Sequence, residues 1–166
     1  MDNRPIGIFD SGVGGLTVLR EIIKSVPNED IIYFGDTARV PYGPRDLIEV
    51  KKFAFKITEF LCKLNVKMIV VACNTSTAAA LDDLTKEFNL PIIGVIEPGA
   101  KTAAQQTKNG RVGVIATKGT VESNAYKIAI NKINPSIELF QVAAPLLVEY
   151  IERGTLNSKS LHSMVI

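Results

Sequence analysis

The sequence predicts an α/β protein with a parallel sheet flanked by helices, arranged as two similar modules of which the second is incomplete. Three observations support this prediction. Short runs rich in Ile and Val alternate with amphipathic helical segments, and such alternation produces parallel strands with right-handed crossovers. The alternation begins again after a Pro-Gly pair at residues 98–99. Polar, small-residue segments follow the strands, where open parallel sheets bind ligands.

The first module is expected to span residues 1–96. Its four apolar runs are typical of strands buried on both faces. They cover residues 5–9, 31–34, 67–72 and 91–96. Helical periodicity fills the intervals between these strands. It is carried by Leu16, Leu19, Ile22 and Ile23, then by residues 47–64, and then by residues 77–88.

The second module is expected to span residues 97–166, beginning at Glu97-Pro98-Gly99, which should break regular structure and act as a hinge. The pattern then predicts a helix over 100–107, a strand over 111–116, a helix over 123–132, a strand over 137–142 and a helix over 146–153. Residues 157–166 are expected to open one more element, with Asn157 or Ser158 as its N-cap. The second layer therefore remains unfinished.

The composition is that of a folded globular protein without a nucleic-acid partner. Among 166 residues, 19 Lys+Arg oppose 17 Asp+Glu, so the net charge is only +2. That balance argues against direct nucleic-acid binding. Hydrophobic residues make up 46% and charged residues 22%, which excludes disorder.

The cysteine count and the apolar runs indicate a cytoplasmic location without a membrane association. The chain contains two cysteines, Cys62 and Cys73, too few for a disulfide scaffold or a thiolate zinc site. No apolar run has the length of a membrane span or the form of a signal peptide. Reduced thiols in the cytoplasm are therefore expected.

Three polar loops should meet at one rim, because the carboxyl ends of parallel strands lie at the same edge of a sheet. Thr117 holds the equivalent place after a strand of the second module. The three loops contain the segments Asp10-Ser11-Gly12-Val13-Gly14-Gly15, Gly35-Asp36-Thr37 with Pro41-Tyr42-Gly43-Pro44, and Cys73-Asn74-Thr75-Ser76-Thr77.

Cys73 lies between a buried strand and the expected first turn of a helix. A helix N-terminus lowers the pKa of a thiol, so Cys73 could serve as a partly ionised base or nucleophile. Asn74 and Thr75 would then supply donors for an anionic ligand. The alternative is a buried structural cysteine. Cys62 lies in the middle of a predicted helix and is interpreted as a small core residue.

The other loop residues have open interpretations. Gly12 and Gly14 fit the start of a dinucleotide fingerprint, but Thr17 replaces its third glycine, so a tight turn explains them equally well. Asp10 could ionise or orient a neighbouring group, or accept hydrogen bonds from loop amides. Tyr42 and Gly43 offer a phenol and an unhindered amide to a ligand, or form an ordinary turn. Asp36 lies nearly twenty residues after Thr17, but no acidic residue at the end of the second strand is assigned to a ribose. His162 is expected to be solvated.

Taken together, these motifs resemble the glutamate racemases, a family within the cofactor-independent aspartate/glutamate racemase superfamily. The resemblance extends in order to about Arg153. It is carried by IGIFDSGVGGLTVL, YFGDTARVPYGPR, VACNTSTAAAL, PIIGVIEPGA and VGVIATKGTVESNAY.

The resemblance implies interconversion of L- and D-glutamate, without any cofactor or metal, to supply D-glutamate for peptidoglycan. In that family one thiolate removes the α-proton and a second thiol protonates the opposite face. By this match Cys73 is the first thiol and Asp10 the acid that assists it. Dimers are common in the family, so a homodimer is one assembly to expect. The implied substrate contacts are Ser11, Tyr42, Gly43, Asn74, Thr75 and Thr117.

The family's second catalytic cysteine lies in a Gly-Cys-Thr-His motif that these 166 residues do not contain. The resemblance therefore implies a C-terminally truncated racemase that by itself is inactive or nearly so. Two alternatives stay open. One is a non-catalytic fragment that binds an anion or a partner chain, and the other is an aspartate racemase of the same superfamily.

Overall fold

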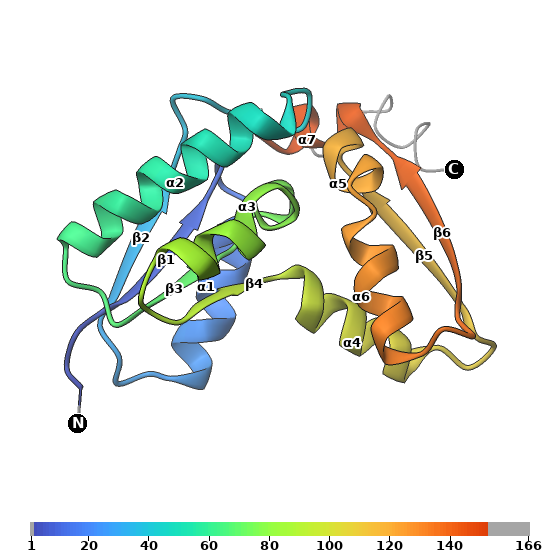
Figure 1. The fold of residues 1–166 in the computed structure, drawn as a ribbon, viewed down its shortest axis with the longest axis horizontal. Coiled ribbons are helices and arrows are strands. Elements are labelled where there is room, and N and C mark those ends of the chain that lie inside the picture. The colour runs from blue at the N-terminus through green and yellow to red at the C-terminus, as the bar shows by residue number, and fades with distance from the viewer. Residues whose placement is uncertain (1, 153–166) are drawn as a thin grey trace.

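A computed structural model describes residues 2–152. Strands and helices alternate along this range and form two groups that lie side by side (Figure 1). The strands in this range are β1 (Ile6–Asp10), β2 (Ile31–Gly35), β3 (Met68–Val71), β4 (Ile92–Gly94), β5 (Arg111–Ala116) and β6 (Glu138–Ala143). The helices are α1 (Gly15–Ser25), α2 (Leu47–Lys63), α3 (Asn74–Glu87), α4 (Ile96–Gln106), α5 (Lys118–Glu122), α6 (Ala125–Ile133) and α7 (Pro145–Glu152).

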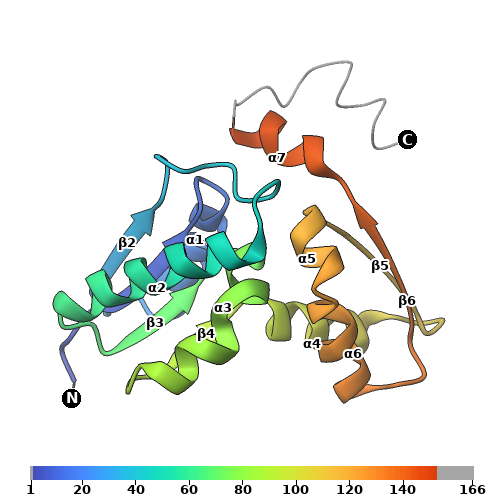
Figure 2. The same cartoon turned by 45° about the horizontal axis from the view of Figure 1, so that its top comes forward.

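The strands form two parallel sheets, as the alternating pattern predicts. The first has the order β2-β1-β3-β4 and the second pairs β5 with β6. Helix α1 packs on one face of the first sheet through Val18 and Ile22. Helices α2 and α3 cover the other face, where Leu61 and Leu84 are fully buried. The prediction of a parallel sheet flanked by helices is confirmed, and Figure 2 shows the helices on both sides of the first sheet.

The prediction that all four strands are buried on both faces is right for β1 and wrong for β2 and β4. Every residue of β1 is buried, whereas every residue of β2 is only partly buried. In β4, Ile93 is 49% exposed. The strand order explains the difference, because β1 lies inside the sheet while β2 and β4 are its two edges.

The expected break at Glu97-Pro98-Gly99 is also wrong, because α4 begins before it at Ile96. Pro98 falls in the first helical turn, where its missing N–H would have had no partner. Ile96 and Ala100 then pack into a core with Ala129, Ile130 and Ile137. Helices α4 and α6 therefore pack together beside the second sheet (Figure 1).

Other boundaries shift more modestly. Helix α3 starts at Asn74 rather than at residue 77. The helix expected over 123–132 begins at Ala125, and a short helix that the periodicity missed, α5, precedes it. Residues 157–166, with Asn157, Ser158 and His162, lie outside the described residues. Within residues 2–152, no helix combines the length and apolarity needed to cross a bilayer.

Gly94 offers a test of how tightly α3 packs on the first sheet. A Cβ at this position would contact Thr77 and lie 2.9 Å from Leu81 Cδ2. We therefore expect Gly94→Ala to lower the free energy of unfolding by about 1–3 kcal/mol, as overpacking does. Gly113→Ala is the matched control, because nothing lies within 4 Å of the added Cβ. Its change should stay within about 0.5 kcal/mol in urea unfolding. Equal losses in both variants would contradict this packing argument.

Candidate active site

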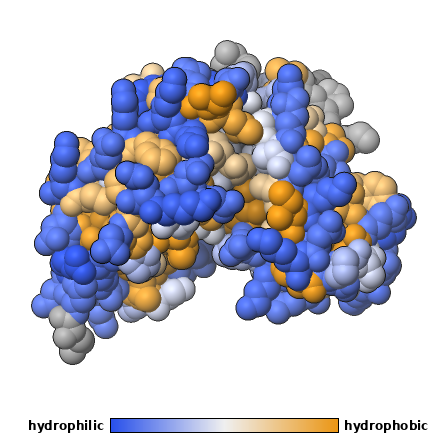
Figure 3. All heavy atoms as spheres, in the orientation of Figure 1, coloured by the Kyte–Doolittle hydropathy of each residue, from blue (hydrophilic) through white to orange (hydrophobic). Residues whose placement is uncertain are grey.

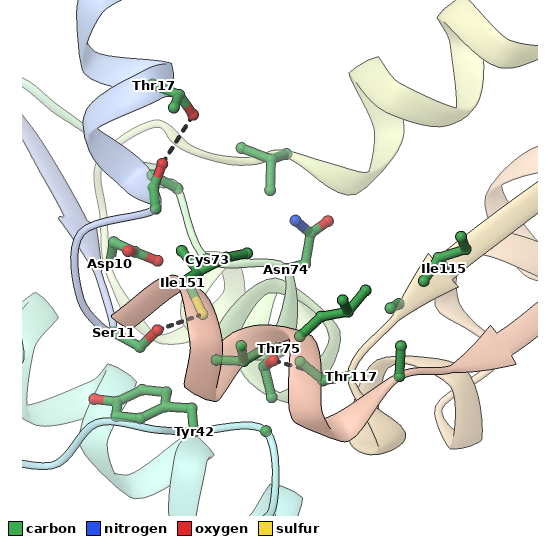
Figure 4. Close-up of a pocket in the computed structure, with 18 of the residues that line it drawn as sticks. Asp10, Ser11, Thr17, Tyr42, Cys73, Asn74, Thr75, Ile115, Thr117 and Ile151 are labelled. Carbon is green, nitrogen blue, oxygen red and sulfur yellow. Dashed lines mark hydrogen bonds between the residues drawn. The ribbon is translucent and has the colours of Figure 1, made fainter. Parts of the chain in front are cut away.

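A cavity of about 410 Å³ lies between the two sheets, at the carboxyl ends of β1 and β3. Residues of β5 and of α7 also line it, and Ile151 of α7 lies near Cys73 in Figure 4. Space-filling atoms show the molecule hollowed between the two halves (Figure 3). The structure brings every predicted site residue to this cavity: Asp10, Ser11, Tyr42, Gly43, Cys73, Asn74, Thr75 and Thr117.

Sheet topology explains why loops far apart in the sequence meet here. Strands β1 and β3 are parallel neighbours, with Phe9 paired to Val71. The Ala72 amide extends this pairing by donating to the Phe9 carbonyl at 2.8 Å. The segments that follow both strands therefore leave the sheet side by side, which places Ser11 next to Cys73.

Cys73 is the N-cap of α3, and its sulfur faces the cavity. The Sγ accepts a hydrogen bond from the Ser76 amide at 3.4 Å and donates one to Ser11 Oγ at 3.6 Å (Figure 4). The residue is only 5% exposed. The thiol is thus held by two neighbours at the rim predicted for it, rather than packed away from that rim.

The pKa of Cys73 is raised, so the expected lowering by the helix N-terminus is wrong for this structure. Burial is the largest cause, and the charge of Asp10 is the next. The hydrogen bonds from Ser76 and with Ser11 act in the opposite direction. Burial and the nearby carboxylate outweigh these hydrogen bonds, because both disfavour the charged thiolate.

This raised pKa predicts a loss of stability at alkaline pH. The folded state holds the Cys73 proton more tightly than the unfolded chain does. Its contribution is therefore complete below the unfolded thiol's pKa, about 8.5, and disappears as the pH rises through the raised folded pKa. We expect the free energy of unfolding to fall over that range, and Cys73→Ala to remove part of the fall. Urea titrations from pH 7 to 10 measure the free energy of unfolding of the parent chain and of Cys73→Ala. Identical pH profiles for the parent and the variant would contradict the prediction.

Asp10 caps the glycine turn. Its Oδ2 accepts hydrogen bonds from the amides of Gly12 at 3.1 Å and Gly15 at 2.8 Å. Gly15 must be glycine, because an added Cβ would lie 2.5 Å from the Asp10 Cβ. These amides are the groups that a dinucleotide fingerprint would turn toward a pyrophosphate. Since Asp10 already occupies them, the structure argues against the nucleotide interpretation.

Tyr42 is buried, and its hydroxyl is committed elsewhere. The phenol donates to Asp36 Oδ2 at 2.5 Å, and Arg39 donates to the same carboxylate oxygen at 2.9 Å. Burial and the Asp36 carboxylate hold the pKa of Tyr42 well above its ordinary value. Figure 4 shows the hydroxyl pointing away from Thr75. The ring lines the cavity, and in this structure the phenol donates its proton to Asp36 rather than toward the cavity.

The second half contributes hydroxyls and an apolar wall. Thr75 Oγ1 and Thr117 Oγ1 lie 3.0 Å apart, and Thr117 Oγ1 lies 2.9 Å from Thr120 Oγ1. The Tyr126 hydroxyl donates to Asn74 Oδ1 at 2.8 Å. Sequence reasoning missed Tyr126, whose only signal was its place at the end of a family motif. It also missed the apolar wall, formed by Val114, Ile115, Ala116, Ala144, Leu147, Val148 and Ile151.

The donors that the cavity offers to an anion are neutral, and the Asp10 carboxylate lines it as well. Among the described residues, no Lys, Arg or His lines it. Hydroxyls, the Asn74 amide and the N-terminus of α3 remain, and helix N-termini favour negative charge. Within residues 2–152, no group of three or more His, Cys, Asp or Glu side chains is placed to hold a metal ion.

Fold and cavity together define an α/β protein with a thiol, a carboxylate and anion donors at the carboxyl edge of a parallel sheet. The sequence model for Asp/Glu/Hydantoin racemase matches residues 6–160. The chain belongs to this family.

Curated relatives narrow the similarity. The chain is 53% identical over 159 residues to the glutamate racemase of Geobacter metallireducens, covering 96% of this chain and 59% of that protein. It is 48% identical over 163 residues to the glutamate racemase of Bacillus cereus, covering 98% of this chain and 61% of that protein. The chain thus spans about three fifths of the length of these relatives.

Solved structures agree with the fold. A crystal structure of a glutamate racemase from Bacillus anthracis superposes with a TM-score of 0.95 at 43% identity, covering 99% of this chain and 62% of that one. The Francisella tularensis glutamate racemase, crystallised with D-glutamate, gives a TM-score of 0.91 at 43% identity, with 99% and 61% covered.

Proposed function

We propose that this chain carries the first half of a glutamate racemase site, in which Cys73 exchanges the α-proton of glutamate without a cofactor. The observation that supports it most directly is the Cys73 thiol, which faces a cavity lined by the neutral donors that a dicarboxylate needs. The Francisella tularensis relative was crystallised with D-glutamate. The proposal includes supply of D-glutamate for peptidoglycan in the cytoplasm.

Anion binding would come from all three loops and from Thr117. Ser11, Thr75 and Thr117 offer hydroxyls, and Asn74 offers an amide beside the start of α3. Gly43 brings its backbone close to Thr117, since an added Cβ would lie 3.2 Å from Thr117 Cγ2. Hydrogen bonds to carboxylates are stronger than neutral ones, which suits a site without basic side chains.

Proton transfer would start from the thiolate of Cys73. The thiolate takes the α-proton, and the electron pair of the broken C–H bond moves onto the α-carbon and its carboxylate. The raised pKa keeps the unliganded thiol protonated. An amino acid brings an ammonium group, and a positive charge near Asp10 and Cys73 favours the ionised thiol. Ligand binding and activation of the base would thus be coupled.

Inversion of glutamate also needs a second thiol on the opposite face of the α-carbon, and the proposal includes this two-thiol mechanism. Cys62 does not line this cavity; it packs beside the core of the first sheet. With Cys73 alone, the proton on its sulfur exchanges with deuterium oxide, and the deuteron returns to the same face of the α-carbon from which the proton left. The 166-residue chain should therefore label one enantiomer of glutamate at the α-carbon with little racemisation.

Incubation of the chain with L- and D-glutamate separately in deuterium oxide tests the proposal. We expect deuterium at the α-carbon of one enantiomer, followed by NMR, and little formation of the other by chiral chromatography. Rapid racemisation by the isolated chain would refute the one-thiol account. Binding of glutamate without any exchange would favour the non-catalytic anion-binding alternative. Faster exchange with aspartate than with glutamate would favour the aspartate racemase alternative.

A further inference from the structure

Tyr126 is a cavity residue without a role in the proposed chemistry. It is the second residue of α6, on the far side of the cavity from the first sheet. Its hydroxyl reaches across to donate to Asn74 Oδ1 at 2.8 Å. Asn74 is the first residue of α3 and directly follows Cys73. Tyr126 therefore touches the residue next to the thiol rather than the thiol itself.

An asparagine side chain can present either a hydrogen-bond donor or an acceptor to a ligand. Its terminal torsion has two broad orientations that exchange the oxygen with the NH₂ group. With Nδ2 toward the cavity it donates to an anion, and with Oδ1 toward the cavity it repels one. In Figure 4 the Asn74 nitrogen lies on the side of the amide nearer Asp10.

We propose that Tyr126 is a positioning residue that holds the Asn74 amide with its Nδ2 donor available to a substrate carboxylate. The phenol occupies Oδ1, which leaves the N–H groups free for the cavity. A hydrogen bond accepted at Oδ1 also polarises the N–H groups of the same amide. This inference rests on the proposed function for its ligand, but the Tyr126–Asn74 contact itself exists without one.

Gly99 leaves room for the Tyr126 hydroxyl beside the cavity. Gly99 of α4 faces the phenol, and an added Cβ there would lie 3.2 Å from the Tyr126 oxygen. The adjacent pair of threonines, Thr75 and Thr117, joins the same two halves at 3.0 Å. Two consecutive residues of α3, Asn74 and Thr75, are thus hydrogen-bonded to Tyr126 and Thr117 of the second half.

The first test needs no ligand. In ¹⁵N NMR spectra, the side-chain amide signals of Asn74 are assigned by their loss in Asn74→Ala. We expect Tyr126→Phe to shift these signals and to increase their mobility, because the ring stays while the hydroxyl is lost. Tyr33→Phe is the control: it removes a hydroxyl that donates to the Gly12 carbonyl at 3.1 Å and should leave Asn74 unchanged. Unaltered Asn74 signals in a folded Tyr126→Phe chain would overturn the proposal.

The second test is a double-mutant cycle on glutamate binding, measured by calorimetry. Tyr126→Phe should raise the Kd about two- to tenfold, the range for one hydrogen bond. On an Asn74→Ala background the same change should have no further effect. An equal loss on both backgrounds would show that Tyr126 acts through packing and would overturn the proposal. If the parent chain binds no glutamate, the proposed function fails, while the NMR result still decides whether Tyr126 positions Asn74.

Discussion

Cys73→Ser is expected to slow deuterium exchange at the α-carbon of glutamate by about 10²–10⁴-fold, the usual contribution of a positioned base. Serine can keep the hydrogen bonds with Ser11 and with the Ser76 amide. It cannot ionise near neutral pH, so the cavity keeps its shape and loses its base. The NMR exchange assay measures the loss, and calorimetry on the same variant checks that glutamate still binds.

Cys62→Ser is the matched control for this prediction. Cys62 lies in α2 and packs against the core of the first sheet, and burial alone raises its pKa. Its replacement should leave the exchange rate within about twofold, because Cys62 does not line the cavity. Exchange that survives Cys73→Ser, or that is lost in Cys62→Ser without unfolding, would show that Cys73 is not the base.

Asp10→Asn is expected to lower the pKa of Cys73 and yet to slow deuterium exchange. Asparagine keeps an oxygen for the Gly12 and Gly15 amides, so the glycine turn should survive. The negative charge that raises the pKa of Cys73 is lost, so that pKa should fall toward its ordinary value. Exchange should nevertheless slow by about 10²-fold or more, because the acid proposed to assist the base is gone.

Alkylation of Cys73 by iodoacetamide across the pH range reports the thiolate directly, with Cys62 distinguished by peptide mass spectrometry. The midpoint in Asp10→Asn should lie at lower pH than in the parent chain. An unchanged exchange rate in Asp10→Asn would show that Asp10 does not assist the base. A midpoint that moves to higher pH would contradict the electrostatic argument.

Much of the architecture was predictable because its signals are local. Ile/Val-rich runs and helical periodicity predicted the strand-helix order, and the strand-end rule brought Asp10, Tyr42, Cys73 and Thr117 to one cavity. The break expected at Pro98 failed because proline is tolerated in a first helical turn. The uniform burial expected of the strands failed at β2 and β4, since apolar composition does not say which strand becomes an edge.

The sequence by itself determined the α/β class, the thiol and the set of hydroxyls and amides offered to a ligand, because side-chain chemistry and hydrophobic period are written along the chain. Only the tertiary structure decided that the Cys73 thiol is held protonated, that the Tyr42 phenol belongs to Asp36, and that Tyr126 reaches Asn74. Those properties depend on burial and on distances between side chains brought together by the fold. The order of residues along the chain specifies neither the burial of a side chain nor its distance from residues far away in the sequence.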